Sequence, residues 1–313
     1  MKLLLTGATG FVGSRLLQSL IKSELNKIVV TTRRNLPDLP IQCVCFLNEG
    51  LSGTANWTAA LSGVDIVVHL ASRVHVMEDK GLNPLAAFRS VNVAGTVKLA
   101  RQAAAAGVKR FLFLSSVKVN GEATKPGRPF REDDKPAPLD PYGISKMEAE
   151  QALRELSSET GMEAVLIRPP LVYGPSVKAN FAKLIGIVES GWPLPLGAVH
   201  NQRSLVALDN LVDFIVTCIT HPQAANQTFL VSDGQDLSTT DLVRGMAQAT
   251  GVPARLLPVP VWALQAGATL LGRGDALQRL CGNLQIDISK ARDLLRWAPP
   301  LSVEEGLRRA MAR

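Results

Sequence analysis

The sequence of 313 residues has few of the features that mark secreted, membrane-spanning or metal-binding proteins. Its cysteines are too few and too scattered for a disulfide framework, and no C-x-x-C pair predicts a zinc site. The apolar run at residues 3–6 stops at Gly7, which is too short for a signal sequence or a membrane span. These absences favour a cytoplasmic protein in a reducing compartment, with no metal site. The four cysteines are Cys43, Cys45, Cys218 and Cys281.

Tyrosine is also scarce, with two residues, and long basic runs are absent although the formal net charge is +7. The basic residues are dispersed, and no aromatic RNA-binding motif accompanies them. This distribution argues against nucleic-acid binding, because a nucleic-acid surface concentrates Lys and Arg in one patch. A modest positive bias instead suits small anionic ligands such as diphosphates.

Short apolar or β-branched runs alternate with longer amphipathic stretches as far as Arg168. This alternation predicts an α/β fold with a doubly wound parallel sheet and crossover helices. The expected strands are residues 3–6, 28–32, 42–47, 65–70, 110–115, 164–168 and, later, 229–232. The expected helices are residues 11–22, 84–106, 142–160 and 209–220, and Gly107 and Gly161 stand where the second and third of these would stop.

A glycine-rich turn follows the first expected strand and opens the first expected helix. Gly7, Gly10 and Gly13 give a G-x-x-G-x-x-G spacing. Such a turn lets the backbone approach a pyrophosphate, and the helix N-terminus supplies free N–H groups. We therefore predict a Rossmann-type NAD(P)-binding site whose contacts include Thr9, Phe11 and Val12 besides the glycines; a turn without a ligand is the weaker alternative.

The end of the second strand bears on the choice of cofactor. An acidic residue there would bind the adenosine ribose of NAD, but this strand ends in Thr32, Arg33 and Arg34. Guanidinium groups suit the 2′-phosphate of NADP, so NADP(H) is slightly favoured and NAD(H) stays possible. The alternative is that both arginines are solvated loop residues.

Tyr142 and Lys146 lie four residues apart at the start of an expected helix, so both side chains share one face. A nearby ammonium would lower the pKa of the phenol and let Tyr142 exchange a proton near neutral pH. Ser116 ends the strand one crossover earlier, where ligands of such sheets bind. The plainer interpretations are an exposed helix face for the pair, and strand-end capping for Ser115 and Ser116.

These residues resemble the extended short-chain dehydrogenase/reductases, and among them the nucleotide-sugar epimerase/dehydratase group. The resemblance covers nearly the whole chain. It is carried by the glycine turn and by six further segments, at residues 69–71, 92–96, 115–116, 142–146, 168–175 and 203–209. It implies a Rossmann domain at 1–168, to which 204–232 return, and a smaller interleaved substrate-binding part at 169–203 and 233–313. It also implies a homodimer that pairs through the helices at 84–106 and 142–160.

The resemblance also implies roles for residues outside the glycine turn. Asn92 would lie behind the catalytic group of Tyr142, Lys146 and Ser116. The further contacts it implies for the cofactor are Leu70, Ala71 and Pro169, and those for the nucleotide-sugar are Asn180, Phe181, Leu196, Gly197, Arg203 and, as a weaker phosphate ligand, Arg279. A guanidinium suits a diphosphate because its planar fork makes two parallel hydrogen bonds. The alternative for Arg203 is a surface ion pair with Asp209 or Asp213.

Two departures from the family pattern narrow the expected chemistry. Dehydratases of the family carry an Asp-Glu pair after the catalytic Ser or Thr, whereas Val117 and Lys118 stand here, so dehydration is disfavoured. Asn120 replaces the Tyr of the usual V-Y-G ending.

What remains is hydride transfer at C4 of a nucleotide-activated sugar, with Tyr142 handling the proton. The sequence favours reduction of a UDP-linked 4-keto-6-deoxy-N-acetylhexosamine, because the missing acid after the second strand suits an exchanging NADP(H). The alternative is a UDP-hexose or UDP-N-acetylhexosamine 4-epimerase with tightly bound NAD. Less favoured are a cofactor-sensing protein without catalysis and a reductase of steroid or phenolic ketones.

Overall fold

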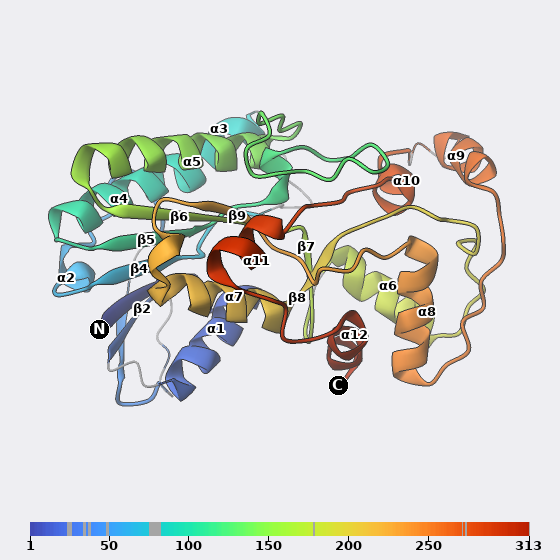
Figure 1. The fold of residues 1–313 in the computed structure, drawn as a ribbon, viewed down its shortest axis with the longest axis horizontal. Helices are drawn as coiled ribbons and strands as arrows, with labels where there is room; N and C mark the ends of the chain where they lie inside the picture. Colours follow the sequence, from blue (N-terminus) through green and yellow to red (C-terminus); the bar gives the residue numbers. More distant parts are fainter. Residues whose placement is uncertain are drawn as a thin grey trace.

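The computed structural model describes residues 1–23, 27–33, 36, 39–47, 50–74, 83–177, 179–270, 272 and 274–312. At positions 179, 180, 275 and 276 it describes the backbone alone. Figure 1 shows a sheet with its helices on one side of the molecule and a smaller, mainly helical part on the other. Among the described residues, no helix is long and apolar enough to cross a membrane.

A parallel seven-stranded sheet of order β3-β2-β1-β4-β5-β6-β9 forms the larger part. Its strands are β1 (Lys2–Thr6), β2 (Lys27–Thr32), β3 (Cys43–Leu47), β4 (Ile66–His69), β5 (Arg110–Leu114), β6 (Glu163–Arg168) and β9 (Thr228–Leu230). The order runs outward in both directions from β1 and β4, which pair with Thr6 opposite His69. This confirms the predicted doubly wound Rossmann-type fold. Ligands of such sheets bind where the strand order reverses, at the carboxyl ends of β1 and β4.

Alternation along the strands explains why both faces of the sheet are covered. Leu3 and Leu5 of β1 belong to one buried cluster and Leu4 to another, because successive side chains point to opposite faces. The first cluster packs under α1 (Phe11–Lys22) and α7 (Leu208–Thr220), and the second under α4 (Thr96–Ala105) and α5 (Pro141–Thr160). In Figure 1 these helix pairs lie below and above the sheet.

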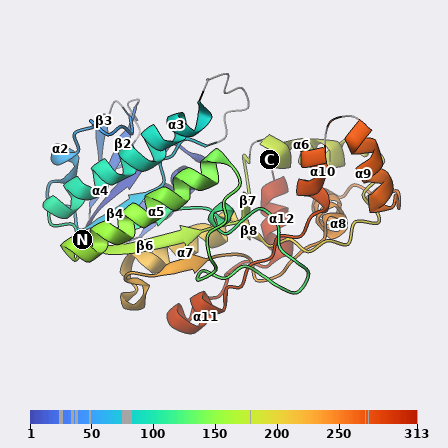
Figure 2. The same cartoon turned by 90° about the horizontal axis from the view of Figure 1, so that it is seen from above.

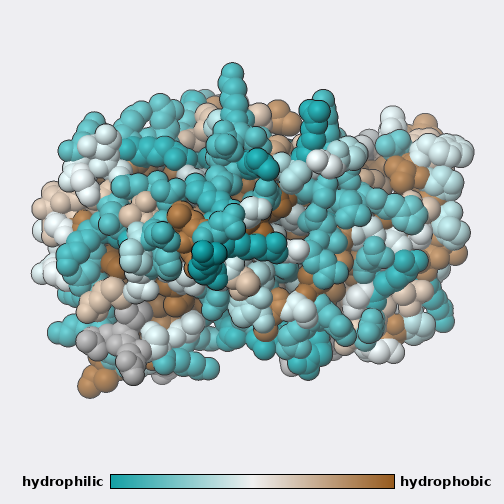
Figure 3. All heavy atoms as spheres, in the orientation of Figure 1, coloured by the Kyte–Doolittle hydropathy of each residue, from teal (hydrophilic) through white to brown (hydrophobic). Residues whose placement is uncertain are grey.

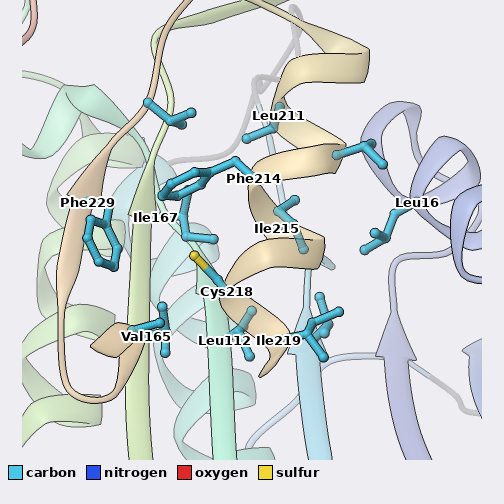
Figure 4. Packing of buried hydrophobic residues seen from close by; sticks show 14 of the residues in the cluster. Leu16, Leu112, Val165, Ile167, Leu211, Phe214, Ile215, Cys218, Ile219 and Phe229 are labelled. Atoms are coloured by element: carbon cyan, nitrogen blue, oxygen red, sulfur yellow. The ribbon is translucent and has the colours of Figure 1, made fainter. Parts of the chain in front are cut away.

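Helix α7 is the best example of how the sequence builds this core. Its apolar residues face the sheet, and Figure 4 shows them against Leu112, Val165 and Ile167 of β5 and β6. Phe214 of α7 also meets Phe229 of β9 edge to face, with 5.5 Å between ring centroids. The late strand β9 joins the sheet beside β6, with Leu230 opposite Arg168. The labelled α7 residues are Leu211, Phe214, Ile215, Cys218 and Ile219.

The helix predicted at residues 84–106 is confirmed as a continuous run of α3 (Pro84–Phe88), the π-helical η1 (Arg89–Gly95) and α4, with right-handed helical backbone at both junctions. The sequence did not predict the π-helical middle, where tertiary contacts crowd the helix. The side chain of Asn92 in η1 is buried and bonds a neighbouring loop, and a Cβ on Gly95 would lie 3.0 Å from Leu51. A π-helical turn of this kind is common beside functional sites.

The smaller part is built around a two-stranded parallel sheet of β7 (Leu171–Tyr173) and β8 (Leu205–Ala207), which the sequence did not reveal. This part also contains α6 (Ala179–Glu189), α8 (Thr239–Thr250), α9 (Val261–Leu270), α10 (Gly274–Cys281) and α12 (Val303–Met311), of which α12 packs on both strands. Figure 2 shows α6, α8, α9 and α10 gathered at one end. Figure 3 shows a largely hydrophilic face, with hydrophobic residues near α9, where Trp262 is exposed. The remaining elements are α2 (Thr58–Leu61), η2 (Val117–Val119), η3 (Pro222–Ala224) and α11 (Ser289–Leu295).

The division of the chain at residues 168, 204 and 232 stays a prediction, and so does the homodimer. The large sheet ends its first run at Arg168, β8 belongs to the small sheet, and β9 returns to the large one. The two parts are thus interleaved along the sequence.

Candidate active site

The turn between β1 and α1 has the shape that a diphosphate requires. Gly7 has φ +74°, and a Cβ there would lie 2.7 Å from the backbone nitrogen of Ala71. A Cβ on Gly13 would lie 2.0 Å from the carbonyl oxygen of Gly7. Gly10 is the exposed N-cap of α1 and offers no side-chain cap to the N–H groups of the first turn, which begins with Phe11 and Val12. The residues present therefore fit a dinucleotide pyrophosphate.

The chain after β4 closes one side of this turn. Ala71 donates its backbone N–H to the hydroxyl of Thr6, and Leu70 donates its own to the Thr6 carbonyl. These bonds fix the 70–71 backbone against Gly7. Thr9 is exposed at the tip of the turn. The structure thus brings together the predicted cofactor residues of the glycine turn and of the β4 end.

The residues predicted to select the cofactor are only partly described. Arg33 follows β2 directly and is exposed. Arg34 lies outside the described residues. A guanidinium at this edge suits a phosphate, yet the exposure of Arg33 fits the plainer solvated interpretation equally well.

Helix α5 holds the predicted catalytic pair. Asp140 caps the helix by accepting a hydrogen bond from the backbone of Gly143 at 2.7 Å, and Pro141 opens it. Tyr142 in the first turn packs edge to face on Phe88, with 6.1 Å between ring centroids. Lys146 is buried one turn later and donates to the carbonyl of Leu114 at 2.8 Å. The two side chains therefore share one helix face at the carboxyl end of β5.

The electrostatics of the pair differ from the sequence prediction. The pKa of Tyr142 is raised, first by burial of the phenol and then by the Asp140 charge, whereas a lowered value was predicted. Lys146, whose ammonium bonds the carbonyl of Leu114 and lies 5.8 Å from the centre of the Tyr142 ring, does not offset these two effects. Burial lowers the pKa of Lys146 itself to about 7. In this state the phenol holds its proton and the amine exchanges one near neutral pH.

Ser116 and Ser115 occupy different environments at the end of β5. Ser116 is half-buried and its Oγ accepts a hydrogen bond from the backbone of Lys118 at 3.3 Å, as the cap of η2. Ser115 is buried, and its Oγ has no hydrogen-bond partner within the described part of the chain. Ser116 is the serine with access to a ligand, while Pro169 beyond β6 is buried and accepts from the backbone of Val117.

Asn92 supports the site indirectly, through hydrogen bonds to the backbone of Arg73 and to Ser145. Its side chain accepts from the backbone N–H of Arg73 at 2.7 Å and donates to the Arg73 carbonyl at 3.0 Å. It also donates to Ser145, whose hydroxyl donates to the carbonyl of Tyr142. Asn92 thus orients the loop after β4 and the first turn of α5.

Sequence reasoning missed a buried histidine beneath the catalytic group. His69 ends β4, and its ring nitrogens lie 2.7 Å from the hydroxyl of Thr6 and 3.0 Å from that of Thr96. The ring lies between Phe111 and Phe113, at centroid distances of 5.7 and 5.8 Å. Burial, and then the charge of Lys146, lowers the pKa of His69 to about 3. The only signal in the sequence was its place in the family segment at residues 69–71.

Because His69 is neutral when folded, we expect acid to weaken the fold well above its own pKa. Between pH 6.5, its ordinary pKa, and about pH 3, His69 is protonated in the unfolded chain but neutral in the folded chain. Within that window His69 lowers the free energy of unfolding by about 1.4 kcal/mol for each unit by which the pH falls. Urea unfolding between about pH 6.5 and about pH 5 should show a smaller slope for His69→Gln. An NMR titration in which all four histidines charge near their ordinary pKa would contradict this expectation.

Asn120, which departs from the family pattern, belongs to a buried polar network. Its amide donates to the Arg131 carbonyl at 2.6 Å and accepts from Arg168 at 3.0 Å. Arg168 also forms a buried ion pair with Glu150 of α5, at 2.6 Å. The amide therefore connects the segment after η2 to β6 and α5. A hydrophobic partner here would leave Arg168 with an unsatisfied N–H.

In the smaller part, the side chain of Arg203 contacts a backbone carbonyl. Its guanidinium donates to the carbonyl of Gly282 at 3.0 Å, and burial lowers its pKa. The predicted alternative, pairing with Asp209 or Asp213, is wrong: Arg15 and Arg309 bind Asp209, and Trp297 donates to Asp213. Arg279 is exposed in the last turn of α10, close in sequence to Gly282.

The remaining predicted substrate residues belong to the smaller part. Phe181 is buried and stacks on Tyr173 at 5.6 Å, so its side chain belongs to the core and leaves its backbone N–H, in the first turns of α6, for a ligand. The side chain of Asn180, one residue earlier, lies outside the described residues. Leu196 is also buried, and a Cβ on Gly197 would lie 2.9 Å from the Leu257 carbonyl.

A glycine turn at the first βα junction and a Tyr-Lys pair after β5 together define a Rossmann-type dinucleotide-dependent enzyme of the extended short-chain dehydrogenase/reductase kind. Residues 3–232 match the NAD dependent epimerase/dehydratase family, and the chain belongs to that family. A "UDP-glucose 4-epimerase" of Vibrio cholerae is 49% identical over 98% of this chain and 93% of its own length.

Two solved structures share the fold at low sequence identity. A UDP-glucuronic acid 4-epimerase from Bacillus cereus, solved with NAD, superposes with a TM-score of 0.79 at 22% identity, covering 99% of this chain and 97% of the other. A UDP-glucose 4-epimerase from Thermotoga maritima, solved with UDP-glucose, gives a TM-score of 0.77 at 22% identity, with the same coverage. Both cover the smaller part as well as the sheet.

Proposed function

We propose that this protein is a UDP-sugar 4-epimerase that works with bound NAD. The observation that carries the proposal is its 49% identity, along nearly the whole chain, to the Vibrio cholerae protein named UDP-glucose 4-epimerase. The sequence alone favoured the reductase and gave the epimerase as its alternative, which the comparisons support better. Val117 and Lys118 in place of a dehydratase's Asp-Glu pair fit inversion without loss of water.

The predicted residues of the glycine turn and of the catalytic group each have a role in this reaction. The glycine turn and the 70–71 backbone hold the pyrophosphate of the cofactor, whose nicotinamide ring supplies the hydride acceptor and donor when bound. Tyr142 would take the proton of the C4 hydroxyl as a phenolate, a form that the positive charge of a bound oxidised nicotinamide would favour, and would then return it. Ser116 donates a hydrogen bond to the same oxygen. Lys146 orients the nicotinamide ribose and, with its pKa near 7, exchanges protons close to Tyr142.

Residues of the smaller part bind the diphosphate of the substrate. Arg203 is a half-buried cation whose side-chain bond goes to a carbonyl, so an anion beside it would offset the partial burial of its charge. The backbone at Phe181 and the exposed Arg279 are the further phosphate ligands we propose, with Leu196 and Gly197 beside the base. Asn180 keeps its predicted role.

Cofactor content and product analysis test the proposal together. Purified protein given UDP-glucose or UDP-N-acetylglucosamine, with no added cofactor, should yield the C4-inverted sugar by NMR, and mass spectrometry of the denatured protein should find NAD. Consumption of NADPH with a UDP-4-keto-6-deoxy-N-acetylhexosamine, without inversion of either UDP-sugar, would instead establish the reductase. The reductase is kept as a second candidate because Arg33 follows β2, where the adenosine ribose of the cofactor is expected to bind.

A further inference from the structure

An ion pair joins the two elements that carry the proton-transfer residues. Lys118, in the turn η2 after Ser116, bonds Asp140 at the cap of α5 through its ammonium, and a second carboxylate, Glu122, lies at 3.4 Å. The other oxygen of Asp140 accepts from the backbone of Gly143. One carboxylate therefore serves both the helix cap and the lysine.

Backbone contacts show that η2 and the first turn of α5 are packed directly together. Lys118 donates its own N–H to the hydroxyl of Ser116 at 3.3 Å. A Cβ on Gly143 would lie 3.0 Å from the carbonyl oxygen of Lys118, so the helix approaches the turn as closely as glycine permits. The backbone of Lys118 therefore contacts Ser116, and its side chain contacts Asp140, the cap of the helix that carries Tyr142.

Asp140 acts on Tyr142 because only one residue separates them in the chain. Its negative charge opposes formation of a phenolate, and it adds to the effect of burial in raising the pKa of Tyr142. An ammonium placed on this carboxylate offsets the charge. Lys146 cannot do so equally, because its ammonium is bonded to Leu114. The charged or titratable groups near Tyr142 on the elements packed around it are Asp140, Lys118, Glu122, Lys146, Glu150, His69, Arg73 and the Arg89–Glu148 pair.

We propose that Lys118 is a positioning residue for Tyr142: its ammonium neutralises Asp140 and ties the cap of α5 to the turn that carries Ser116. The inference rests on the proposed role of Tyr142 in moving the proton at C4. This role gives a reason for a lysine at position 118, which belongs neither to the hydrophobic core nor to the glycine turn that binds the cofactor. A carboxylate at that place, beside Asp140 and Glu122, would gather three negative charges at the helix cap.

The scarcity of tyrosine makes the electrostatic effect directly measurable. With Tyr142 and Tyr173 the only two, incorporation of a fluorinated tyrosine gives two ¹⁹F resonances, which Tyr173→Phe assigns. Fluorination lowers the pKa of the phenol and brings its titration into reach. Tyr173 is buried and donates to Asp233, far along the chain from the cap, so its resonance serves as an internal control.

The experiment is a double-mutant cycle read by these titrations. Lys118→Met should move the Tyr142 midpoint upward by about half a pH unit, and Asp140→Asn, which keeps a cap acceptor, should move it downward. The double variant should lie between the two single variants, because the opposite effects of the two charges on the phenol add. An unchanged midpoint in Lys118→Met would overturn the proposal.

Kinetics supply the second readout. Lys118→Met should lower kcat more than it raises KM and should shift the pH profile in the direction of the NMR midpoint, while Lys118→Arg should restore most of the rate. Glu122→Gln is the matched control, since Glu122 contacts the same ammonium but does not cap α5. Equal losses in Glu122→Gln and Lys118→Met would refute the specific role of Asp140. Absence of any epimerase activity would refute the proposed function but leave the titration result standing.

Discussion

Replacing Tyr142 with phenylalanine is expected to lower kcat by roughly 10²- to 10⁴-fold, the usual contribution of a positioned acid–base group. The change removes only the hydroxyl, so the edge-to-face contact with Phe88 at 6.1 Å is kept. KM for the UDP-sugar should change far less, because the proton is moved in the transition state and contributes little to ground-state binding. Steady-state kinetics with UDP-glucose measure both constants, and mass spectrometry checks that the cofactor is still bound.

Tyr173→Phe is the matched control for this prediction. Tyr173 is the only other tyrosine, and its hydroxyl donates to Asp233 at 2.7 Å in the core of the smaller part. Its loss should cost stability of about 1 kcal/mol but leave kcat within a few-fold of the parent. If Tyr142→Phe kept a tenth or more of the parent rate, or if both variants fell equally, Tyr142 would not be the proton carrier.

The parts of the site that the sequence predicted are those fixed by local chain geometry. A turn that follows a strand and opens a helix needs glycine wherever the backbone comes close, so Gly7, Gly10 and Gly13 carried the signal by themselves. The four-residue spacing of Tyr142 and Lys146 likewise fixes a shared helix face. The sheet followed from the alternation of apolar strands and amphipathic helices, and its seven-strand order matches that class.

What the sequence did not predict depends on residues far apart in the chain. The direction of the Tyr142 pKa shift was wrong because burial and Asp140 decide it, while Leu114 takes the ammonium that was expected to lower it. The ring of His69 is held by the hydroxyls of Thr6 in β1 and Thr96 in α4, which lie far from it in the sequence. Such partners are set by tertiary packing, which no spacing along the sequence records.

The choice between epimerase and reductase could not be made from residues at all. Both reactions transfer hydride at C4 and need the same proton carrier, so Tyr142, Lys146 and Ser116 fit each of them. The feature used to separate them was the missing acid after β2, where Arg33 and Arg34 stand. Arg33 is exposed and compatible with either cofactor, and Arg34 lies outside the described residues. Identity along the whole chain, to the Vibrio cholerae relative, carried the proposal further than any single position.

Gly13→Ala is expected to abolish retention of the dinucleotide and to weaken the fold. The added Cβ would lie 2.0 Å from the carbonyl oxygen of Gly7 and 2.7 Å from its carbonyl carbon. Both are backbone atoms, so the whole turn must move away from α1, and with it the N–H groups that face the pyrophosphate. We expect a loss of roughly 3 kcal/mol in unfolding free energy, at the upper end for an overpacked site.

Two further alanine variants separate the contribution of the turn from that of helix packing. Gly10→Ala places its Cβ 3.2 Å from the Gly7 carbonyl oxygen, at an exposed position, so it should retain the fold and lose the cofactor. Gly186→Ala in α6 meets nothing within 4 Å and should stabilise the helix by about 0.5 to 1 kcal/mol. Urea unfolding must be compared on cofactor-free protein, because bound NAD would itself stabilise the parent by mass action. A Gly13→Ala protein that keeps its full NAD content and its stability would show that the turn does not hold the pyrophosphate, and the proton chemistry assigned to Tyr142 would lose its hydride partner.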